Sequence, residues 1–270
     1  MTVTDAQVHV WSRVRPGGRA HYPGPFGHNQ LIPLMVEAGV DRAILVPPSW
    51  SDDENAVALS AARADPRRFA VMGVLALDQP ESRDRVAGWN SQPGMLGLRQ
   101  TFHTEQLAAR LWDGTIEWFW AAAQAAQIPV MIYPPGRLEH IERIARDYPQ
   151  LRLVIDHMGM PPVDRTSGND ELDIATLLRL APLKNVGVKI SGLPLFSRTD
   201  YPFLDVHDCV WRVVEAFGAN RSFWGSDITR LSCSYVQAVS MVAEVLPGLD
   251  ADDMELIMGR GLSEWLGWPT

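Results

Sequence analysis

The chain has 270 residues, of which 46% are hydrophobic and 21% charged, and it carries a formal net charge of −8. This composition allows a sizeable core, and it argues against nucleic-acid binding because no basic stripe is present to neutralise phosphates. The first ten residues lack the basic and apolar regions of a signal peptide, and Pro129 interrupts the longest apolar stretch. Cys209 and Cys233 have no CxxC partner, so reduced thiols are expected. We therefore expect a cytoplasmic protein that does not bind membranes.

Short apolar runs alternate with helical patterns along the whole chain. Strands are predicted over 2–10, 41–46, 68–77, 95–101, 129–133, 151–156, 185–190 and 221–225. Helices are predicted over 29–38, 52–64, 81–89, 115–126, 138–148, 172–180, 207–217, 235–246 and 252–266. The alternation indicates a parallel sheet, which an open doubly wound fold would also give. Eight strands with reactive residues after the first, sixth and last favour a closed (β/α)8 TIM barrel with C-terminal helices, built as a single domain over 1–270.

Three predicted strands deliver a residue that can transfer a proton or bind a metal. His9 closes the first strand, His157 follows the sixth, and Asp227 follows the eighth. In a closed barrel the carboxyl ends of the strands form one face, so these side chains are expected to meet there. The sequence therefore predicts Asp227, His157 and His9 as catalytic residues. For Asp227, the competing interpretation is a cap on the following turn.

Further polar side chains at strand ends are candidates for substrate binding. Arg99 lies within an apolar run, where a guanidinium must either be paired or face a pocket, and its planar fork suits a carboxylate. Tyr133 could donate its hydroxyl to a ligand or close the rim. Lys189 could be a ligand group or an interior ion-pair partner. Arg230 could bind an anionic substrate or form an ion pair on the rim.

The spacing of these residues resembles a known family. The motifs Asp5-x-x-x-His9, Asp156-His157-x-Gly159, Lys189-x-Ser191-Gly192 and Trp224-Gly-Ser-Asp227 are similar to those of the amidohydrolase superfamily. The similarity extends over nearly the whole chain and is strongest to the "amidohydrolase 2" branch, which includes lactonases and a zinc-dependent decarboxylase.

The resemblance also raises the question of a metal. In metal-dependent members the ligands come from a His-x-His pair, a histidine on strand five and the aspartate on strand eight. These positions are here Gln7 and His9, Tyr133, and Asp227, so that two histidine ligands are replaced. We therefore expect no metal cofactor, with Gln7 counted among the substrate-binding residues. If a divalent metal is present, Mn or Zn on His9, His157 and Asp227 is the alternative.

The resemblance implies a hydrolase of a small, carboxylated or aromatic-derived lactone or ester. Asp227 is expected to activate water, while His9, His157 and Arg99 stabilise the developing oxyanion. One alternative is a metal-dependent decarboxylase or hydrolase of the same branch, and another is a catalytically weakened subunit that supports an active partner. The expected partner is a small-molecule substrate, and assembly into a homo-oligomer is left open. The loop that carries Arg13, Arg15 and Arg19 is expected to shape specificity.

Overall fold

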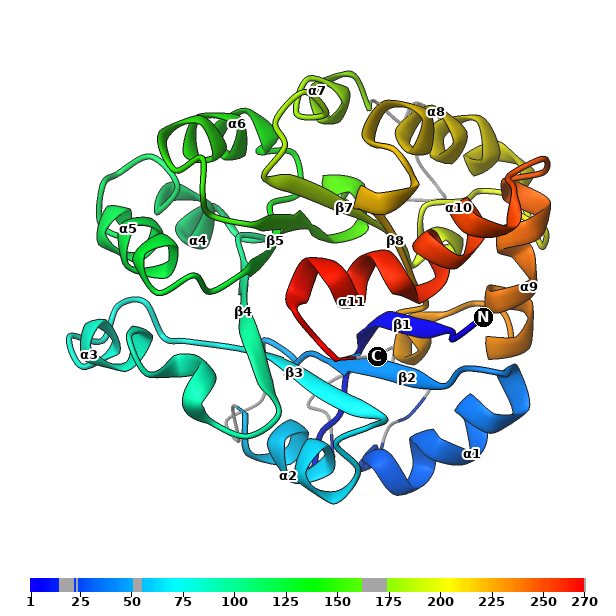
Figure 1. The fold of residues 1–270 in the computed structure, drawn as a ribbon, viewed down its shortest axis with the longest axis horizontal. Coiled ribbons are helices and arrows are strands. Elements are labelled where there is room, and N and C mark those ends of the chain that lie inside the picture. The colour runs from blue at the N-terminus through cyan, green and yellow to red at the C-terminus, as the bar shows by residue number, and fades with distance from the viewer. Residues whose placement is uncertain (15–21, 23, 51–54, 162–173, 270) are drawn as a thin grey trace.

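Eight parallel strands form a nearly closed barrel in which each strand pairs with the next one along the chain (Figure 1). The computed structural model describes residues 1–14, 22, 24–50, 55–161 and 174–269. The strands are β1 (Thr4–Val8), β2 (Arg42–Leu45), β3 (Phe69–Gly73), β4 (Met95–Thr101), β5 (Val130–Tyr133), β6 (Leu153–Ile155), β7 (Val186–Ser191) and β8 (Ser222–Gly225). The predicted (β/α)8 architecture is therefore confirmed.

Helices surround the barrel, and most of them lie within a few residues of the predicted bounds. They are α1 (His28–Ala38), α2 (Ala56–Ala64), α3 (Ser82–Val86), α4 (Glu105–Ala109), α5 (Glu117–Ala125), α6 (Leu138–Asp147), α7 (Ala175–Leu178), α8 (His207–Phe217), α9 (Tyr235–Val245), α10 (Ala251–Glu255) and α11 (Gly261–Leu266). Residues 52–54 and 172–173, which belong to two predicted helices, lie outside the described residues.

Two segments differ from the sequence prediction. Helix α4 was not expected, because five residues are too few to show a helical period. Its start is set by the Thr104 side chain, which accepts a hydrogen bond from the backbone N–H of Leu107. The single helix predicted over 252–266 is instead α10 and α11, separated by five residues of π-helix, η7 (Leu256–Arg260), in which Gly259 leaves the helical conformation.

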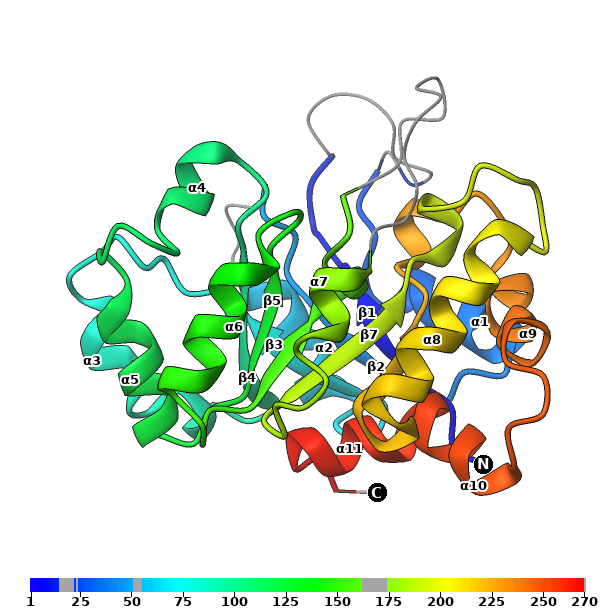
Figure 2. The same cartoon turned by 90° about the horizontal axis from the view of Figure 1, so that it is seen from above.

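The amino ends of the strands are closed by apolar packing. Leu262 and Leu266 of α11 pack together with side chains from inside the barrel, which are Ala6, Ile44, Val46, Ala70, Met72, Met131, Val154 and Phe223. Arg42, at the start of β2, donates a hydrogen bond to Ser263 of α11. Figure 1 shows α11 crossing the barrel, and Figure 2 places it at the end of the strands where the N-terminus also lies. We call this apolar end, sealed by α11, the floor of the barrel. The opposite end of the strands can then hold the active site.

The pairing of β1 is irregular at a position that matters for the site. The register between β1 and β2 shifts between Asp5 and Val8. Ala6 and Gln7, although adjacent in sequence, both lie inside the barrel, because Ala6 joins the interior cluster and Gln7 contacts Lys189. A strictly alternating strand would send one of them outward. The irregularity therefore brings a polar amide into the barrel interior.

The seam between β1 and β8 is joined by a few specific hydrogen bonds. The backbone N–H of Asp227 donates to the Gln7 carbonyl over 3.0 Å. The fully buried Asp5 carboxylate accepts from the backbone N–H of Ser226 over 2.9 Å and from the Tyr235 hydroxyl over 2.7 Å. Burial raises the pKa of Asp5, while these donors act in the opposite direction. Asp5 thus fixes the loop that carries Asp227.

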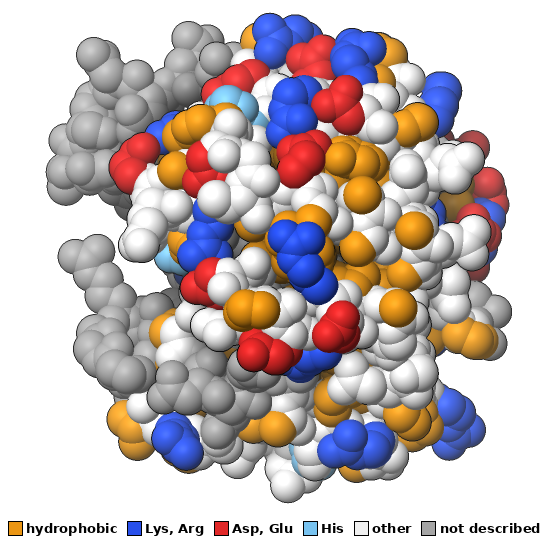
Figure 3. Space-filling model, turned by 90° about the vertical axis from the view of Figure 1, so that its left-hand side faces the viewer, with side chains coloured by type: hydrophobic (Ala, Val, Ile, Leu, Met, Phe, Trp, Pro, Cys, Tyr) orange, Lys and Arg blue, Asp and Glu red, His pale blue; other side chains and the backbone are white. Residues whose placement is uncertain are grey.

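The outer surface around α5 and α6 carries interspersed charges. Arg143 pairs with Glu117 at 3.4 Å, and Arg146 pairs with Glu142 at 2.9 Å. Figure 3 shows Lys and Arg mixed with Asp and Glu on this face, without a basic patch. Exposed pairs of this kind contribute little to stability. In the part of the chain that is described, no helix is both long and apolar enough to cross a membrane.

Candidate active site

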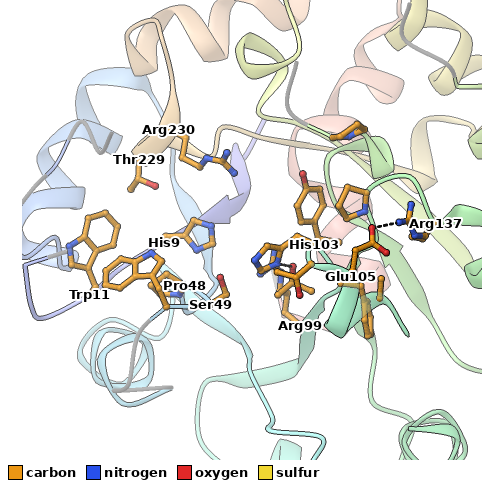
Figure 4. A pocket seen from close by; sticks show the side chains of 18 residues that line it. His9, Trp11, Pro48, Ser49, Arg99, His103, Glu105, Arg137, Thr229 and Arg230 are labelled. Carbon is orange, nitrogen blue, oxygen red and sulfur yellow. Dashed lines mark hydrogen bonds and ion pairs between the residues drawn. The ribbon is translucent and has the colours of Figure 1, made fainter. Parts of the chain in front are cut away.

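A cavity of about 520 Å³ opens at the carboxyl ends of the strands. His9 after β1, Arg99 in β4 and Tyr133 at the end of β5 line it, together with Arg230 from the short helix η6 (Ile228–Arg230). Figure 4 shows Arg230 and His9 on one side of this cavity, with Arg99 and His103 on the other. Four of the residues that the sequence predicts for the site therefore line one cavity.

Asp227 lies directly behind this wall. Its side chain is fully buried, and neither carboxylate oxygen has a hydrogen-bond partner among the described residues. Three nitrogens stand just beyond hydrogen-bond distance of it: His9 Nε2 at 3.6 Å, Arg230 Nη1 at 3.8 Å and His157 Nε2 at 3.9 Å. Although Asp227 precedes η6, its side chain makes no capping bond to that helix. The interpretation of Asp227 as a simple cap is therefore wrong.

The backbone at this site adopts conformations that are uncommon for residues with a side chain. Asp227 has φ of 53°, and His157 has φ of 54° within the short helix η2 (Asp156–Gly159). Left-handed backbone of this kind costs of the order of 1 kcal/mol per residue and tends to cluster where function requires it. Gly192 has φ of 64°, and a Cβ at this position would lie 3.3 Å from His157 Nδ1. The glycine therefore lets β7 close tightly against His157.

His9 is held by hydrogen bonds to both ring nitrogens. Nδ1 lies 2.7 Å from the Val46 carbonyl oxygen, and Nε2 lies 3.3 Å from Gln7 Nε2. Burial lowers the pKa of His9 to about 4, although the nearby Asp227 carboxylate acts to raise it. His9 is consequently neutral at neutral pH.

His157 is also buried and lies against strand β7. Its Nδ1 is 2.9 Å from Ser191 Oγ and 3.2 Å from the Ser191 carbonyl oxygen. Burial lowers the pKa of His157. Tyr133 packs edge-on against it, with ring centroids 5.3 Å apart, and donates its hydroxyl to the Met160 carbonyl over 3.2 Å. Burial raises the pKa of Tyr133 to about 12, so its hydroxyl keeps its proton.

A buried ion network supports these residues inside the barrel. Asp156 pairs with Arg99 Nε at 3.0 Å and with Lys189 Nζ at 2.8 Å. Lys189 is fully buried and also donates to Gln7 Oε1 over 2.7 Å. Burial acts to raise the pKa of Asp156, but the ammonium and the guanidinium outweigh it and hold the pKa far below its usual range.

The side chains around Asp227 bear on whether a metal ion could bind there. Among the described residues, no group of three or more His, Cys, Asp or Glu side chains is placed to hold a metal ion. Gln7 turns its oxygen toward Lys189 and its amide nitrogen toward His9. A metal ligand at this position would have to present a lone pair instead. The orientation of Gln7 therefore does not favour a metal ligand at its position.

The two interior cations predicted from the sequence turn out to share one partner. Arg99 is both paired with Asp156 and part of the cavity lining, so both of its expected environments occur together. Lys189 is an interior ion-pair partner, and neither Lys189 nor Gln7 is among the described residues that line the cavity. Of the loop arginines, Arg15 and Arg19 lie outside the described residues, and Arg13 is not part of the described lining.

Sequence reasoning did not single out several residues of this site. Asp156 was noted only as part of a motif, although its place two residues after the inward Val154 could have marked it as an interior carboxylate. Trp11 and Trp50 form an aromatic wall of the cavity, with ring centroids 5.5 Å apart. Both tryptophans belong to loops, where no periodic sequence pattern indicates which way a side chain points.

Comparison with known proteins agrees with this geometry. A family model described as amidohydrolase matches residues 4–260. The L-fucono-1,5-lactonase of Burkholderia ambifaria is 30% identical over 241 residues, which are 84% of this chain and 81% of that protein. The 4-sulfomuconolactone hydrolase of Hydrogenophaga intermedia is 25% identical over 217 residues, which are 77% of this chain and 67% of that protein.

A solved structure has the same fold. The crystal structure of an amidohydrolase from Burkholderia multivorans with bound zinc gives a TM-score of 0.84 at 24% identity, and the match covers 100% of both chains. The family model spans almost the whole chain, and the cavity lined by His9, Arg99 and Arg230 lies at the carboxyl ends of the strands. The chain therefore belongs to the amidohydrolase family and is a hydrolase.

Proposed function

We propose that this protein hydrolyses the ester bond of a small lactone that carries a carboxylate, without a metal and with Asp227 as the general base. The observation that carries this proposal is the Asp227 carboxylate, which is fully buried, lacks a hydrogen-bond partner among the described residues and stands directly behind the cavity wall. A carboxylate that is not committed to a donor is free to accept a proton from water.

The chemistry would proceed in two proton transfers. Asp227 takes a proton from water as the oxygen attacks the lactone carbonyl, and the negative charge moves to the carbonyl oxygen. Arg99 and Arg230 line the cavity, and their N–H groups stabilise that charge. The ring C–O bond then breaks, and Asp227 returns the proton to the departing alkoxide. The product is the open hydroxy acid.

This assignment revises the expected role of His9. Its Nδ1 faces a carbonyl oxygen, which can only accept a hydrogen bond, so the single ring proton of the neutral imidazole lies there. Its Nε2 has no proton to give to an oxyanion. We therefore assign the stabilisation of the oxyanion to the two arginines.

Substrate would reach Asp227 past Arg230. The Arg230 side chain is 37% exposed, and its Nη1 lies 3.8 Å from the carboxylate, too far for a hydrogen bond. A substrate carboxylate that draws this guanidinium into the cavity would uncover Asp227. Binding of an anionic group and exposure of the base would then be a single event.

The proposed substrate class combines the relatives with the cavity. The two curated relatives described above are named for lactones. Arg99 and Arg230 line the cavity, which favours an anionic group, and Trp11 with Trp50 offers an apolar wall for a ring. A compact lactone with one carboxylate matches both features.

The test is a panel of five- and six-membered lactones in matched pairs, with and without a carboxylate, followed by acid release. We expect kcat/KM to be at least about tenfold higher for the carboxylated member of each pair, as one charge-assisted contact would give. Arg230→Met should abolish this preference. Arg67→Met, at the opposite end of the barrel, is the matched control. Equal rates within the pairs would refute the anionic substrate, and inertness across the panel would favour a weakened partner subunit.

A further inference from the structure

A continuous hydrogen-bonded chain connects the barrel interior to the cavity wall. It runs from Asp156 to Lys189 over 2.8 Å, from Lys189 to Gln7 over 2.7 Å and from Gln7 to His9 over 3.3 Å. It then ends at Val46, whose carbonyl oxygen is 2.7 Å from His9 Nδ1. Each member except His9 is fully buried, so water does not compete for these bonds. The chain is therefore expected to have one defined arrangement of protons.

The orientation of Gln7 follows from Lys189. An ammonium group has three donors and no acceptor, so it can only face the oxygen of an amide. The amide nitrogen of Gln7 must then face His9, and it donates a proton to whatever lone pair lies there. Burial lowers the pKa of Lys189, while the Asp156 carboxylate, 2.8 Å from the ammonium, acts to raise it and holds Lys189 in place.

The Val46 carbonyl favours the same position of the His9 proton from the other side of the ring. The Val46 carbonyl can only accept, so Nδ1 carries the ring proton. Nε2 then has a lone pair, which is what the Gln7 amide requires. The two ends of the chain thus favour the same tautomer of His9, and each contributes to holding it.

The tautomer of His9 affects Asp227, whose Oδ1 is 3.6 Å from His9 Nε2. In the opposite tautomer, Nε2 would carry an N–H beside this oxygen, and a small movement of either side chain would form a charge-assisted bond, which would make the carboxylate a weaker base. We propose that Lys189 and Gln7 are positioning residues that hold His9 with its proton on Nδ1, and thereby keep His9 from bonding the Asp227 carboxylate. The catalytic consequence rests on the proposed function, whereas the tautomer itself does not.

The test is nuclear magnetic resonance of protein labelled with ¹⁵N-histidine, with the His9 signals assigned by their loss in His9→Asn. The wild-type protein should show a protonated Nδ1 and an unprotonated Nε2. Gln7→Glu places a carboxylate oxygen of the substituted side chain itself against His9 Nε2, and Nε2 should then carry a proton. Gln7→Met removes the amide without adding charge, so the fraction protonated at Nε2 should rise to an intermediate value. The His157 signals in the same spectra serve as the internal control.

Activity gives the second readout on a substrate found in the lactone panel. We expect kcat to fall from wild type to Gln7→Met to Gln7→Glu, by about tenfold at the end of the series, while KM changes much less. A wild-type His9 protonated at Nε2 would overturn the inference, as would an unchanged tautomer in both variants. The spectra need no substrate, so a protein inert toward every lactone would refute the proposed function and leave the tautomer result standing.

Discussion

The two ends of the barrel interior differ in the side chains that the eight strands place there. At the amino ends, apolar side chains such as Ala70 fill the interior, and α11 seals it. Nearer the carboxyl ends, Arg99, Lys189 and Asp156 are charged and pair with one another. The floor stabilises the fold by burying apolar surface, whereas each charge above it must find a partner to offset its desolvation. Asp227 is the exception, since its nearest cation, Arg230, is 3.8 Å away and its carboxylate accepts no hydrogen bond from the described residues.

The largest expected effect concerns that exception. Asp227→Asn keeps the size of the side chain but cannot accept a proton, so kcat should fall by about 10²–10⁴-fold. The free energy of unfolding should change little, because the carboxylate oxygens make no hydrogen bond within the described residues. Steady-state kinetics and urea unfolding measure the two effects. Near-normal turnover in this variant would place the base elsewhere, with His157 as the next candidate.

The second prediction concerns the paired charges. Asp156→Ala leaves the Lys189 ammonium and the Arg99 guanidinium inside the barrel without their carboxylate, and it should cost about 3–5 kcal/mol of unfolding free energy. The matched control is Asp208→Ala, which removes an exposed partner of Arg212 and should cost at most about 0.5 kcal/mol. Similar losses of unfolding free energy in the two variants would show that the interior network stabilises the fold no more than an exposed ion pair does.

The third prediction concerns the floor. Leu262→Ala in α11 removes a buried side chain from the interior cluster and should cost about 3 kcal/mol of unfolding free energy. Because Leu262 lies at the end of the barrel remote from the cavity, kcat and KM should stay within about twofold of wild type. A large loss of kcat in this folded variant would mean that the two ends are not independent.

The fourth prediction is a dependence of stability on pH. The pKa of His9 is lowered to about 4 in the folded protein, whereas an unfolded histidine titrates near 6.5. Between these values the unfolded state binds more protons, so stability should fall as the pH drops through this window. His9 alone should account for about 2 kcal/mol between pH 7 and pH 5. The lowered pKa of His157 acts in the same direction.

Urea unfolding at the two pH values measures this change. His9→Asn should remove the His9 share of it, while His140→Asn, at a surface histidine of α6, should leave it in place. A wild-type protein with equal stability at pH 7 and pH 5 would contradict the prediction.

The smallest expected effect is that of a chelator, which should be none. Because Gln7 presents its amide nitrogen to His9 and we propose hydrolysis without a metal, activity should survive prolonged treatment with EDTA. Elemental analysis of the purified protein is the companion measurement. Stoichiometric zinc or manganese, together with activity lost to the chelator and restored by that ion, would support the metal-dependent alternative.

The sequence by itself determined the order of the elements and the positions of His9, His157 and Asp227 at the ends of their strands. Apolar runs and helical periods are local properties, and a closed parallel barrel brings all carboxyl ends to one face. The sequence also indicated that Arg99 and Lys189 needed partners, since a charge in an apolar run is costly when unpaired.

Only the tertiary structure decided which groups meet across the barrel. Asp156 serves both Arg99 and Lys189, and this depends on the register of three separate strands. The shifted pairing of β1 turns Gln7 inward, and Lys189 then sets the orientation of its amide. Neither fact is visible in a local pattern, because alternation tells which face of a strand a side chain occupies and not what lies opposite it. The Asp227 carboxylate accepts no hydrogen bond from the described residues, and this too depends on neighbours that only the closed barrel brings around it.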